Sequence, residues 1–411
     1  MAERQIHRQL AGITSLDRRF MNRLLLYIGD TLLGDINKFA KNRHLTETLK
    51  SEAENASADT FTFDINWKQF QDFVRKYFDD DPANLLRVGK TRVVFETDDY
   101  VRFAGYLAAR PARTGLGADQ TLSLTFYEYF ARLSGDLVCD PSNTKSPMRT
   151  FSSVAANDYV KALVNEFLAR ASAAGETINW TWGTVDVLRA KTITYKDFQT
   201  VSKALCDAMN NVEGAGKFDI VFRTDPEDYT HQIIDILKPR GKSKNIIIKY
   251  PADGVYKLWA SNYSIDETNE YASHVLVAGN GQVGDPTTGE QTAKLGMASN
   301  LDFVSDYCYW RTYETASNLY SQNAVDNYAN TRLSQLDFNL ETPHISLVGR
   351  PIAWGQAENE DNGLALGDTF YFEENTDDGS DHSGYYRIIG LDTTWDDNGV
   401  ATVTPTLVED N

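Results

Sequence analysis

The chain of 411 residues is too long for one ordinary hydrophobic core, and its length predicts about two to four domains. Hydrophobic residues make up 42% of the sequence and aromatic residues 12%, which excludes a wholly disordered chain. The formal net charge of −18 argues against a protein that binds nucleic acid or an anionic membrane, because phosphate groups would repel it. The same charge suits an ordinary soluble surface, and also a passage that DNA traverses without adhering.

The cysteines Cys139, Cys206 and Cys308 are far apart and form no C-x-x-C pair. This pattern is typical of unpaired thiols in a protein that folds in a reducing cytoplasm. The N-terminus has no apolar segment of a signal peptide, and no apolar run is long enough to span a bilayer. We therefore expect no membrane anchor.

The first part of the chain favours strands. Residues 1–20 are polar and rich in arginine, and we expect an arm outside the first core. Residues 37–57 are polar and acidic, which favours a helix or a loop. Asn66 is expected to cap a helix near 66–78, whose aromatic stripe predicts one buried face. Strands are expected over 20–28, 60–65, 87–96, 100–107 and 121–130.

From about residue 150 the pattern changes to mixed helix and strand. Asn157 is expected to cap a helix that Gly175 ends. Thr194 and Asp197 resemble a capping box for a second helix, and a third is expected over 316–332. Strands are expected over 218–223, 231–237, 245–250 and 255–259, in the apolar run before Gly279, and over 343–348, 369–372, 385–391 and 401–407.

Three features recur in the same order near both ends of the chain. They are a G-x-T turn, a Y-x-R-x-x-G strand and a threonine-rich strand, at 89–91, 100–105 and 121–125 and again at 367–369, 385–390 and 402–406. The repeat predicts a multidomain α+β fold in which two similar antiparallel β-barrels flank mixed α/β subdomains. The expected domains are the arm 1–20, a first barrel domain 21–150, an α/β middle region 151–335 with two subdomains, and a second barrel domain 336–411.

Residues 273–285 contain a strand-like run followed by G-x-G-x-x-G, the spacing of a dinucleotide fingerprint. That fingerprint needs a helix directly after its glycines, because the pyrophosphate binds at the helix N-terminus. Gly289 follows soon afterwards, no helical period begins before about residue 295, and Asp285 would place a carboxylate beside the phosphate. We therefore expect a turn between strands and no bound cofactor.

Metal-binding patterns are equally weak. The acidic segment 375–384 could gather Asp377, Asp378, Asp381 and His382 around a cation, but it lacks the ligand ladder of an EF-hand. The triplet 79–81 is expected to be a solvated helix end. The histidines form no H-x-x-x-H or H-E-x-x-H motif and are His7, His44, His231, His274, His344 and His382.

Catalytic patterns are not found either. The sequence has no G-x-S-x-G elbow, and no cysteine has the context of a nucleophile. Carboxylates such as Asp98 or Glu128 could serve a glycosidase, but the sequence does not give their separation from a partner. The basic segment 238–244 is expected to be a hairpin tip. We predict no catalytic, cofactor-binding or metal-binding residue.

Three stretches carry a resemblance to a known family: 89–105 with 122–133, 275–281, and 366–390. The chain resembles the tail hub proteins of tailed bacteriophages, which are related to the central baseplate hub of contractile tails and to the N-terminal module of tail-associated lysins. The resemblance implies two similar β-barrels with two α/β subdomains between them. It also implies a homotrimer whose barrels form a pseudo-sixfold ring.

The resemblance further implies a structural virion protein at the tail tip that takes part in host cell entry and genome ejection. Its ring would join the hexameric distal tail ring to the threefold tip, with a tape measure protein and tip fibre or spike proteins as further partners. DNA would only pass through the channel, and assembly would take place in the host cytoplasm.

Two alternative functions stay open beside the structural hub. One is a cell-wall-degrading tail enzyme, although relatives that digest peptidoglycan carry the lysin as an added C-terminal domain. This chain stops at Asn411, just after the second predicted barrel, so that activity is not expected. The other is a receptor-binding module that contacts a host saccharide through residues 375–384.

Overall fold

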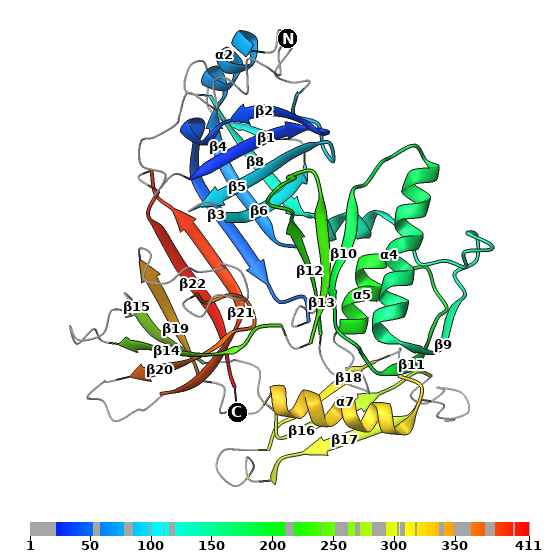
Figure 1. The fold of residues 1–411 in the computed structure, drawn as a ribbon. Coiled ribbons are helices and arrows are strands. Elements are labelled where there is room, and N and C mark those ends of the chain that lie inside the picture. Colours follow the sequence, from blue (N-terminus) through cyan, green and yellow to red (C-terminus); the bar gives the residue numbers. More distant parts are fainter. Residues whose placement is uncertain are drawn as a thin grey trace. The chain divides into compact units, whose positions relative to one another are not determined.

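The computed structural model of the chain consists of two compact units (Figure 1). Unit 1 comprises Met1–Lys244, Leu347–Asp368 and Ile388–Thr406, and unit 2 comprises Asn245–Ser346, Thr369–Arg387 and Leu407–Asn411. The structure describes residues 22–51, 58–77, 85–97, 100–109, 111–114, 120–209, 218–238, 240–250, 262–267, 272–281, 293–301, 304, 309–316, 319–336, 341–348, 363–374, 383–397 and 399–410.

The N-terminal part of unit 1 folds into an antiparallel sheet with the strand order β3-β4-β8-β6-β5-β1-β2, and the short β7 pairs with β8. The strands expected in this region are confirmed as β1, β4, β5, β6 and β8. The elements are β1 (Arg23–Ile28), β2 (Thr31–Asp35), β3 (Ala40–Thr48), β4 (Thr60–Asn66), β5 (Thr91–Thr97), β6 (Tyr100–Leu107), β7 (Ala112–Thr114), β8 (Thr121–Glu128) and the 3-10 helix Tyr129–Gly135.

Strand β3 lies in the polar region 37–57, where we expected a helix or a loop, and that expectation is wrong. Only the short 3-10 turn Asn37–Phe39 precedes the strand. β3 pairs with β4 on one side and with residues 390–395 of β21 (Gly384–Trp395) on the other. Because both edges of β3 are hydrogen-bonded, tertiary pairing outweighs the weak strand propensity of its polar sequence.

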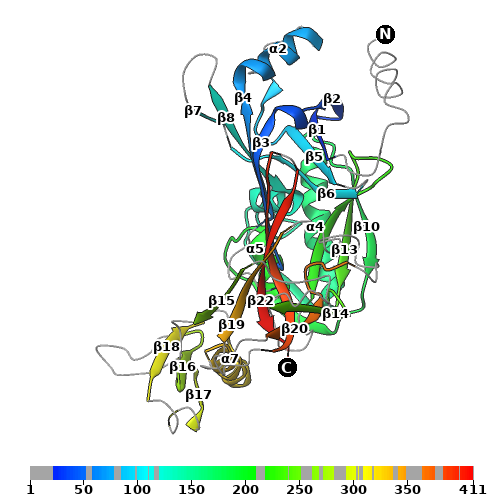
Figure 2. The same cartoon turned by 90° about the vertical axis from the view of Figure 1, so that its left-hand side faces the viewer.

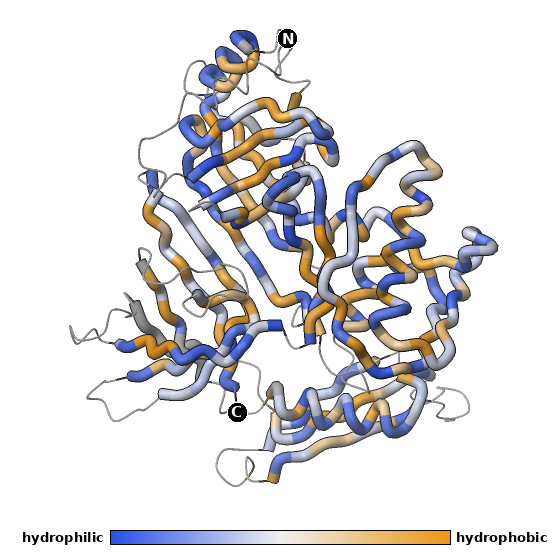
Figure 3. Tube along the Cα trace, viewed as in Figure 1, coloured by the Kyte–Doolittle hydropathy of each residue, from blue (hydrophilic) through white to orange (hydrophobic). Residues whose placement is uncertain are grey.

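Aromatic side chains fill the core of this sheet. Phe61 stacks on Phe95 with ring centroids 4.9 Å apart, and Phe63 stacks on Phe126 at 5.5 Å. Trp395 of β21 meets the ring of Phe95 edge-on at 4.9 Å. Figure 3 shows hydrophobic and hydrophilic residues interspersed along these strands. Successive side chains point to opposite faces of a strand, so one set of positions lines the core.

The helix α2 (Trp67–Tyr77) begins where the sequence predicts it. Oδ1 of Asn66 accepts a hydrogen bond from the N–H of Gln69 at 3.0 Å, which confirms the expected cap. Phe70 and Val74 are buried, so the predicted aromatic stripe is a core face.

Two helices and a three-stranded sheet share one core in unit 1. In this sheet, of order β10-β13-β12, β10 runs parallel to β13 and β12 runs antiparallel to it. Gly175, with φ 86, follows the first helix as expected. The elements are β9 (Arg149–Ala155), α4 (Ala156–Ala173), β10 (Trp180–Val185), β11 (Ala190–Tyr195), α5 (Val201–Met209), β12 (Asp219–Thr224) and β13 (Gln232–Leu237).

The caps of these two helices differ from those we expected. Asn157 lies inside α4, and its Oδ1 accepts from the N–H of Leu188 at 3.0 Å. Thr194 belongs to β11. The residue that acts as the cap of α5 is Thr200, whose Oγ1 accepts from the N–H of Lys203 at 3.2 Å. Asn157 therefore bonds to a residue distant in the sequence and does not cap α4. Thr194 does not cap α5, because it lies in a strand that the sequence did not predict.

Unit 2 contains strand pairs and a small α/β layer. β14 pairs with β20, β15 with β19 and β20 with β21, while β17-β16-β18 form a separate sheet that carries α7 on one side (Figure 2). The helix expected over 316–332 is confirmed, with Ser321 as its cap. The strand expected over 255–259 lies outside the described residues. The remaining elements of the chain are β14 (Ser243–Tyr250), β15 (Asn262–Glu267), β16 (His274–Ala278), β17 (Leu295–Ser299), β18 (Arg311–Thr315), α7 (Gln322–Gln335), β19 (Glu341–Val348), β20 (Thr369–Glu374) and β22 (Ala401–Glu409).

The two repeated segments share a glycine of positive φ before a strand, although the two glycine N–H groups donate to different positions of the strand after that one. Gly89 and Gly367 both adopt positive φ, 73° and 89°. The N–H of Gly89 donates to the carbonyl of Leu107 at 2.9 Å, and that of Gly367 donates to Ile388 at 2.8 Å. Each glycine precedes a strand that pairs antiparallel with the next one, β5 with β6 and β20 with β21. The described strand pairings form open paths, so closure into barrels stays a prediction.

Replacing Gly105 with alanine is expected to destabilise unit 1 by about 1–3 kcal/mol, because overpacking forces backbone and side chains apart. A Cβ at this position would lie 2.3 Å from the carbonyl oxygen of Tyr127 and 2.7 Å from the ring of Phe103. Chemical denaturation of the Gly105→Ala variant measures the loss. Gly135→Ala is the control, since nothing lies within 4 Å of its added Cβ, and an equal loss in both variants would contradict the close approach.

Candidate functional site

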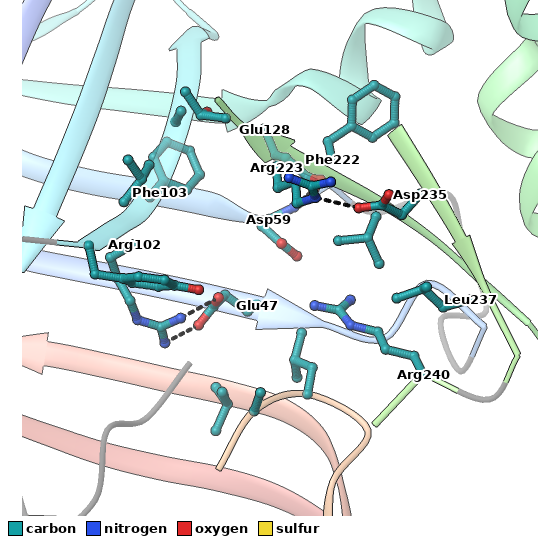
Figure 4. A pocket seen from close by; sticks show the side chains of 18 of the residues that line it. Glu47, Asp59, Arg102, Phe103, Glu128, Phe222, Arg223, Asp235, Leu237 and Arg240 are labelled. Atoms are coloured by element: carbon teal, nitrogen blue, oxygen red, sulfur yellow. Dashed lines mark hydrogen bonds and ion pairs between the residues drawn. The ribbon is translucent and has the colours of Figure 1, made fainter. Parts of the chain in front are cut away.

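A polar cavity of about 510 Å³ lies within unit 1, lined mainly by β3, β6, β12 and β13 and the residues near them (Figure 4). Positive and negative side chains alternate around it. Strands far apart in the sequence supply these charges, so the cavity exists only in the folded unit. The charged lining residues are Glu47, Asp59, Glu128, Asp235, Lys50, Arg102, Arg223 and Arg240.

Lys50 is the most deeply buried of these charges, with 1% of its surface exposed. Its Nζ lies 2.8 Å from Oε2 of Glu128 and 3.8 Å from Oδ2 of Asp59, and 5.4 Å from the ring centre of Phe130. Removing an ammonium group from water is costly unless carboxylates surround it. Lys50 therefore depends on these two acids to stay buried and charged.

The protonation of this cluster follows from burial and from the number of charges. Burial raises the pKa of Glu128 to about 7, the Lys50 ammonium opposes that rise, and the Asp59 carboxylate adds to it. Burial by itself would lower the pKa of Lys50, but Asp59 and Glu128 outweigh it and raise that pKa. One ammonium thus neutralises two carboxylates only in part, and Glu128 takes up a proton near neutral pH.

Two further ion pairs line the cavity and link strands to one another. Arg102 of β6 donates two hydrogen bonds to Glu47 of β3, one of them 2.7 Å long. Nε of Arg223 on β12 lies 2.6 Å from Oδ2 of Asp235 on β13. Figure 4 shows both pairs, with Arg240 directed towards the cavity between them. The Arg223–Asp235 pair lies across two hydrogen-bonded strands, where opposite charges stabilise the pairing, while the Arg102–Glu47 pair links two strands that are not hydrogen-bonded to each other.

The carboxylates of the cavity share one feature with glycosidase sites. An acid with a raised pKa beside a second carboxylate is typical of glycosidases. Glu128, however, is 6% exposed, and its Oε2 binds the Lys50 ammonium and lies 3.4 Å from the backbone nitrogen of Asp59. Asp98, the other residue considered, lies outside the described residues. The Glu128 carboxylate is therefore bound by groups of the protein itself.

The glycine-rich stretch has a packing role at its start. The N–H of Gly279 donates to the carbonyl of Lys294 at 2.8 Å, and that of Asn280 donates to Leu319 at 2.7 Å. A Cβ on Gly279 would lie 2.6 Å from Cγ2 of Val325 on α7. Both backbone amides are therefore used in hydrogen bonds within the protein, and the glycine is needed for helix packing. The last three motif positions, 282–284, lie outside the described residues.

The histidines in the described residues each have separate surroundings. His44 lies 2.7 Å from Asp392, and His231 lies 3.0 Å from Asp225. Among the residues that the structure describes, no group of three or more His, Cys, Asp and Glu side chains could hold a metal ion. His7, residues 377–382 and the triplet 79–81 fall outside them.

The described cysteines, Cys139 and Cys206, are buried and unpaired, as expected. Burial raises the pKa of the Cys206 thiol to about 12, which keeps it in the protonated thiol form at neutral pH. Cys308 lies outside the described residues.

The basic segment 238–244 is not a hairpin tip, and that expectation is wrong. In the described residues it connects β13 to β14, which do not pair with each other. Nζ of Lys244 lies 3.8 Å from Oδ2 of the buried Asp368, and the N–H of Lys242 donates to the same carboxylate at 2.8 Å. Asp368, which is distant in the sequence, therefore binds the buried Lys244 side chain, while Lys242 is exposed and contributes only its backbone N–H.

None of the helices in the described part of the chain combines the length and the apolar character that crossing a bilayer requires.

Solved structures of tail proteins share the fold of this chain. The 43 kDa tail protein of prophage MuSo2 from Shewanella oneidensis is 12% identical, with a TM-score of 0.59 over 94% of this chain and 98% of that one. The tail protein from Neisseria meningitidis MC58 is also 12% identical, with a TM-score of 0.56 over 95% and 97%. No family model and no curated protein matches the chain. The chain thus has the largely antiparallel, multidomain fold of phage tail proteins, which agrees with the resemblance seen in its sequence.

Replacing Lys50 with methionine is expected to lower the free energy of unfolding by about 3–5 kcal/mol, because it leaves buried carboxylates without their cation. Chemical denaturation at neutral pH measures the effect. Lys203→Met is the matched control, since the Lys203 side chain is 56% exposed and its surface ion pair contributes no more than about 1 kcal/mol. Equal stability of the two variants would contradict the role of Lys50.

Replacing Glu128 with glutamine is expected to change the pH dependence of stability. The folded-state pKa of Glu128, about 7, exceeds its ordinary value of 4.5, so the folded state binds more protons between these pH values. This group therefore makes the unfolding free energy fall as pH rises from 4.5 to 7. Relative to Glu128→Gln, the wild-type protein should lose about 1 kcal/mol or more across this window.

Denaturant titrations at several pH values provide the measurement. Glu176→Gln, which alters a carboxylate with 46% of its side chain exposed, should follow the wild-type profile. A constant difference between wild type and Glu128→Gln across the window would refute the raised pKa.

Proposed function

We propose that the chain is a structural hub protein of a phage tail. The observation that carries the proposal is the coverage of the fold match, 94% of this chain and 98% of the Shewanella oneidensis prophage tail protein. A match over both whole chains concerns the complete arrangement of elements, whereas a single common domain would cover only part of each. The sequence resemblance to tail hub proteins points to the same role.

The finer form of the proposal is a homotrimeric ring at the tail tip. The repeated geometry around Gly89 and Gly367 supports two similar β modules in each chain. Closed into barrels within the domains 21–150 and 336–411, these modules would give a trimer six similar contact surfaces. Such a ring suits a hexameric distal tail ring as its partner on one side and a threefold tip on the other.

The charge of the chain fits a channel that DNA crosses. A formal net charge of −18 repels phosphate groups and keeps DNA mobile. The proposed partners are the distal tail ring, the tape measure protein and tip fibre or spike proteins, with DNA only in transit. The virion tail tip is the proposed location, after assembly in the host cytoplasm.

The proposed role needs no catalysis. The Glu128 carboxylate in the unit 1 cavity is bound to Lys50, and Glu47 is bound to Arg102, so neither is free to act on a saccharide. Cell-wall digestion and saccharide binding through residues 375–384 are the alternatives that experiments should separate from the structural role.

The purified chain is expected to form a trimer with three times the protomer mass of 46.2 kDa. Light scattering coupled to size-exclusion chromatography at micromolar concentration gives this mass directly. A monomer throughout the concentration range would count against the ring.

Zymography on host cell walls and binding to intact host cells test the alternatives. We expect neither lysis nor binding by the isolated chain. Clear lysis would establish a cell-wall-degrading enzyme, and saturable binding to cells would favour the receptor-binding module.

A further inference from the structure

The three-stranded sheet of unit 2 has one covered and one open face. α7 packs on the face that carries Val275, Val277 and Ala298. The next residues along each strand point the other way, and the register places Leu276 between Met297 of β17 and Tyr313 of β18. Figure 2 shows α7 on one side of the sheet only.

Large apolar and aromatic side chains are exposed on the open face. Met297 is 58% exposed, Tyr313 is 50% exposed and Tyr309 is 59% exposed. The ring of Tyr309 lies 4.8 Å from that of His274, which brings it to this side of the sheet. Tyrosine, methionine and arginine are enriched in protein interfaces relative to the rest of the surface. The open face, defined by His274, Leu276, Met297, Tyr309, Arg311 and Tyr313, therefore has the composition of an interface.

The charge of the open face differs from that of the chain. Its described strand positions include Arg311 and His274 but no aspartate or glutamate. The one acidic residue of β18, Glu314, lies on the covered side, where it accepts from Nε of Arg332 at 2.6 Å. The whole chain has 58 acidic and 40 basic residues. Because the net charge is negative, two copies of the chain repel each other over most of their surfaces. The open face carries Arg311 and no described acidic residue, so it attracts an acidic surface.

We propose that a second copy of this chain docks on the open face through part of its acidic surface. The inference rests on the proposed ring function and identifies one contact within it. Open face against open face would bring Arg311 near its own copy, which charge disfavours. The contact is therefore between two different surfaces, and such head-to-tail contacts generate a ring such as a trimer when the rotation between copies closes.

The test uses the full-length chain with Tyr313→Asp, which puts an acid at the centre of the face, and with Arg311→Glu, which reverses its charge. Tyr320→Asp is the matched control, because Tyr320 is 53% exposed in the same unit but precedes α7 and lies outside the open face. Light scattering over a concentration series gives the dissociation constant of the assembly. Circular dichroism and thermal melting verify that every variant is folded.

Both open-face variants are expected to weaken assembly at least tenfold, while Tyr320→Asp assembles like wild type. Added salt should weaken the wild-type assembly, because it screens the attraction between Arg311 and the acidic partner surface. Folded open-face variants that assemble like wild type would overturn this inference and leave the ring function standing. A wild-type chain that is itself monomeric would overturn both.

Discussion

Lys50 carries a positive charge into a part of unit 1 that water hardly reaches, and its neighbours are arranged around that charge. Glu128 at the end of β8 and Asp59 just before β4 supply the negative charges. The next residue, Ser51, donates from its N–H and its hydroxyl to the buried Asp219, at 3.1 Å each. The chain after β3 is thus tied to β4, β8 and β12 at once. A shift of β3 by one residue would separate the ammonium from its carboxylates, so the charge fixes the register.

The cavity beside Lys50 is lined by charged side chains that bind one another. Raised pKa values and clustered carboxylates mark many catalytic sites, and Glu128 has both properties. Its oxygens, however, face an ammonium group and a backbone amide, and the paired strands leave it 6% exposed. The cost of burial is offset by partners within the protein. Perturbed acidity here is a consequence of packing, which agrees with a structural role in a phage tail.

Glycines in this chain serve close packing more than ligand binding. Gly105 stands where a Cβ would collide with the backbone of β8, and Gly279 stands where it would collide with α7. The fingerprint-like spacing that begins at Gly279 is therefore explained by helix packing at its first position. On the same small sheet, the face opposite α7 exposes Met297 and Tyr313, and this contrast supports its proposed role as a contact surface.

Local periodicity in the sequence determined the strands β4, β6 and β8, and the cap at Asn66 with the stripe behind it determined α2, because neighbouring residues decide these features. The sequence also carried the resemblance that the fold match supports. It could not indicate β3 or the burial of Lys50, since lysine is rarely buried and its carboxylates come from other strands. The contacts of residues 238–244 with Asp368 could not be predicted from the sequence either, because Asp368 is distant along the chain. Only the tertiary structure decided these features, because each depends on a partner that the folded chain brings close.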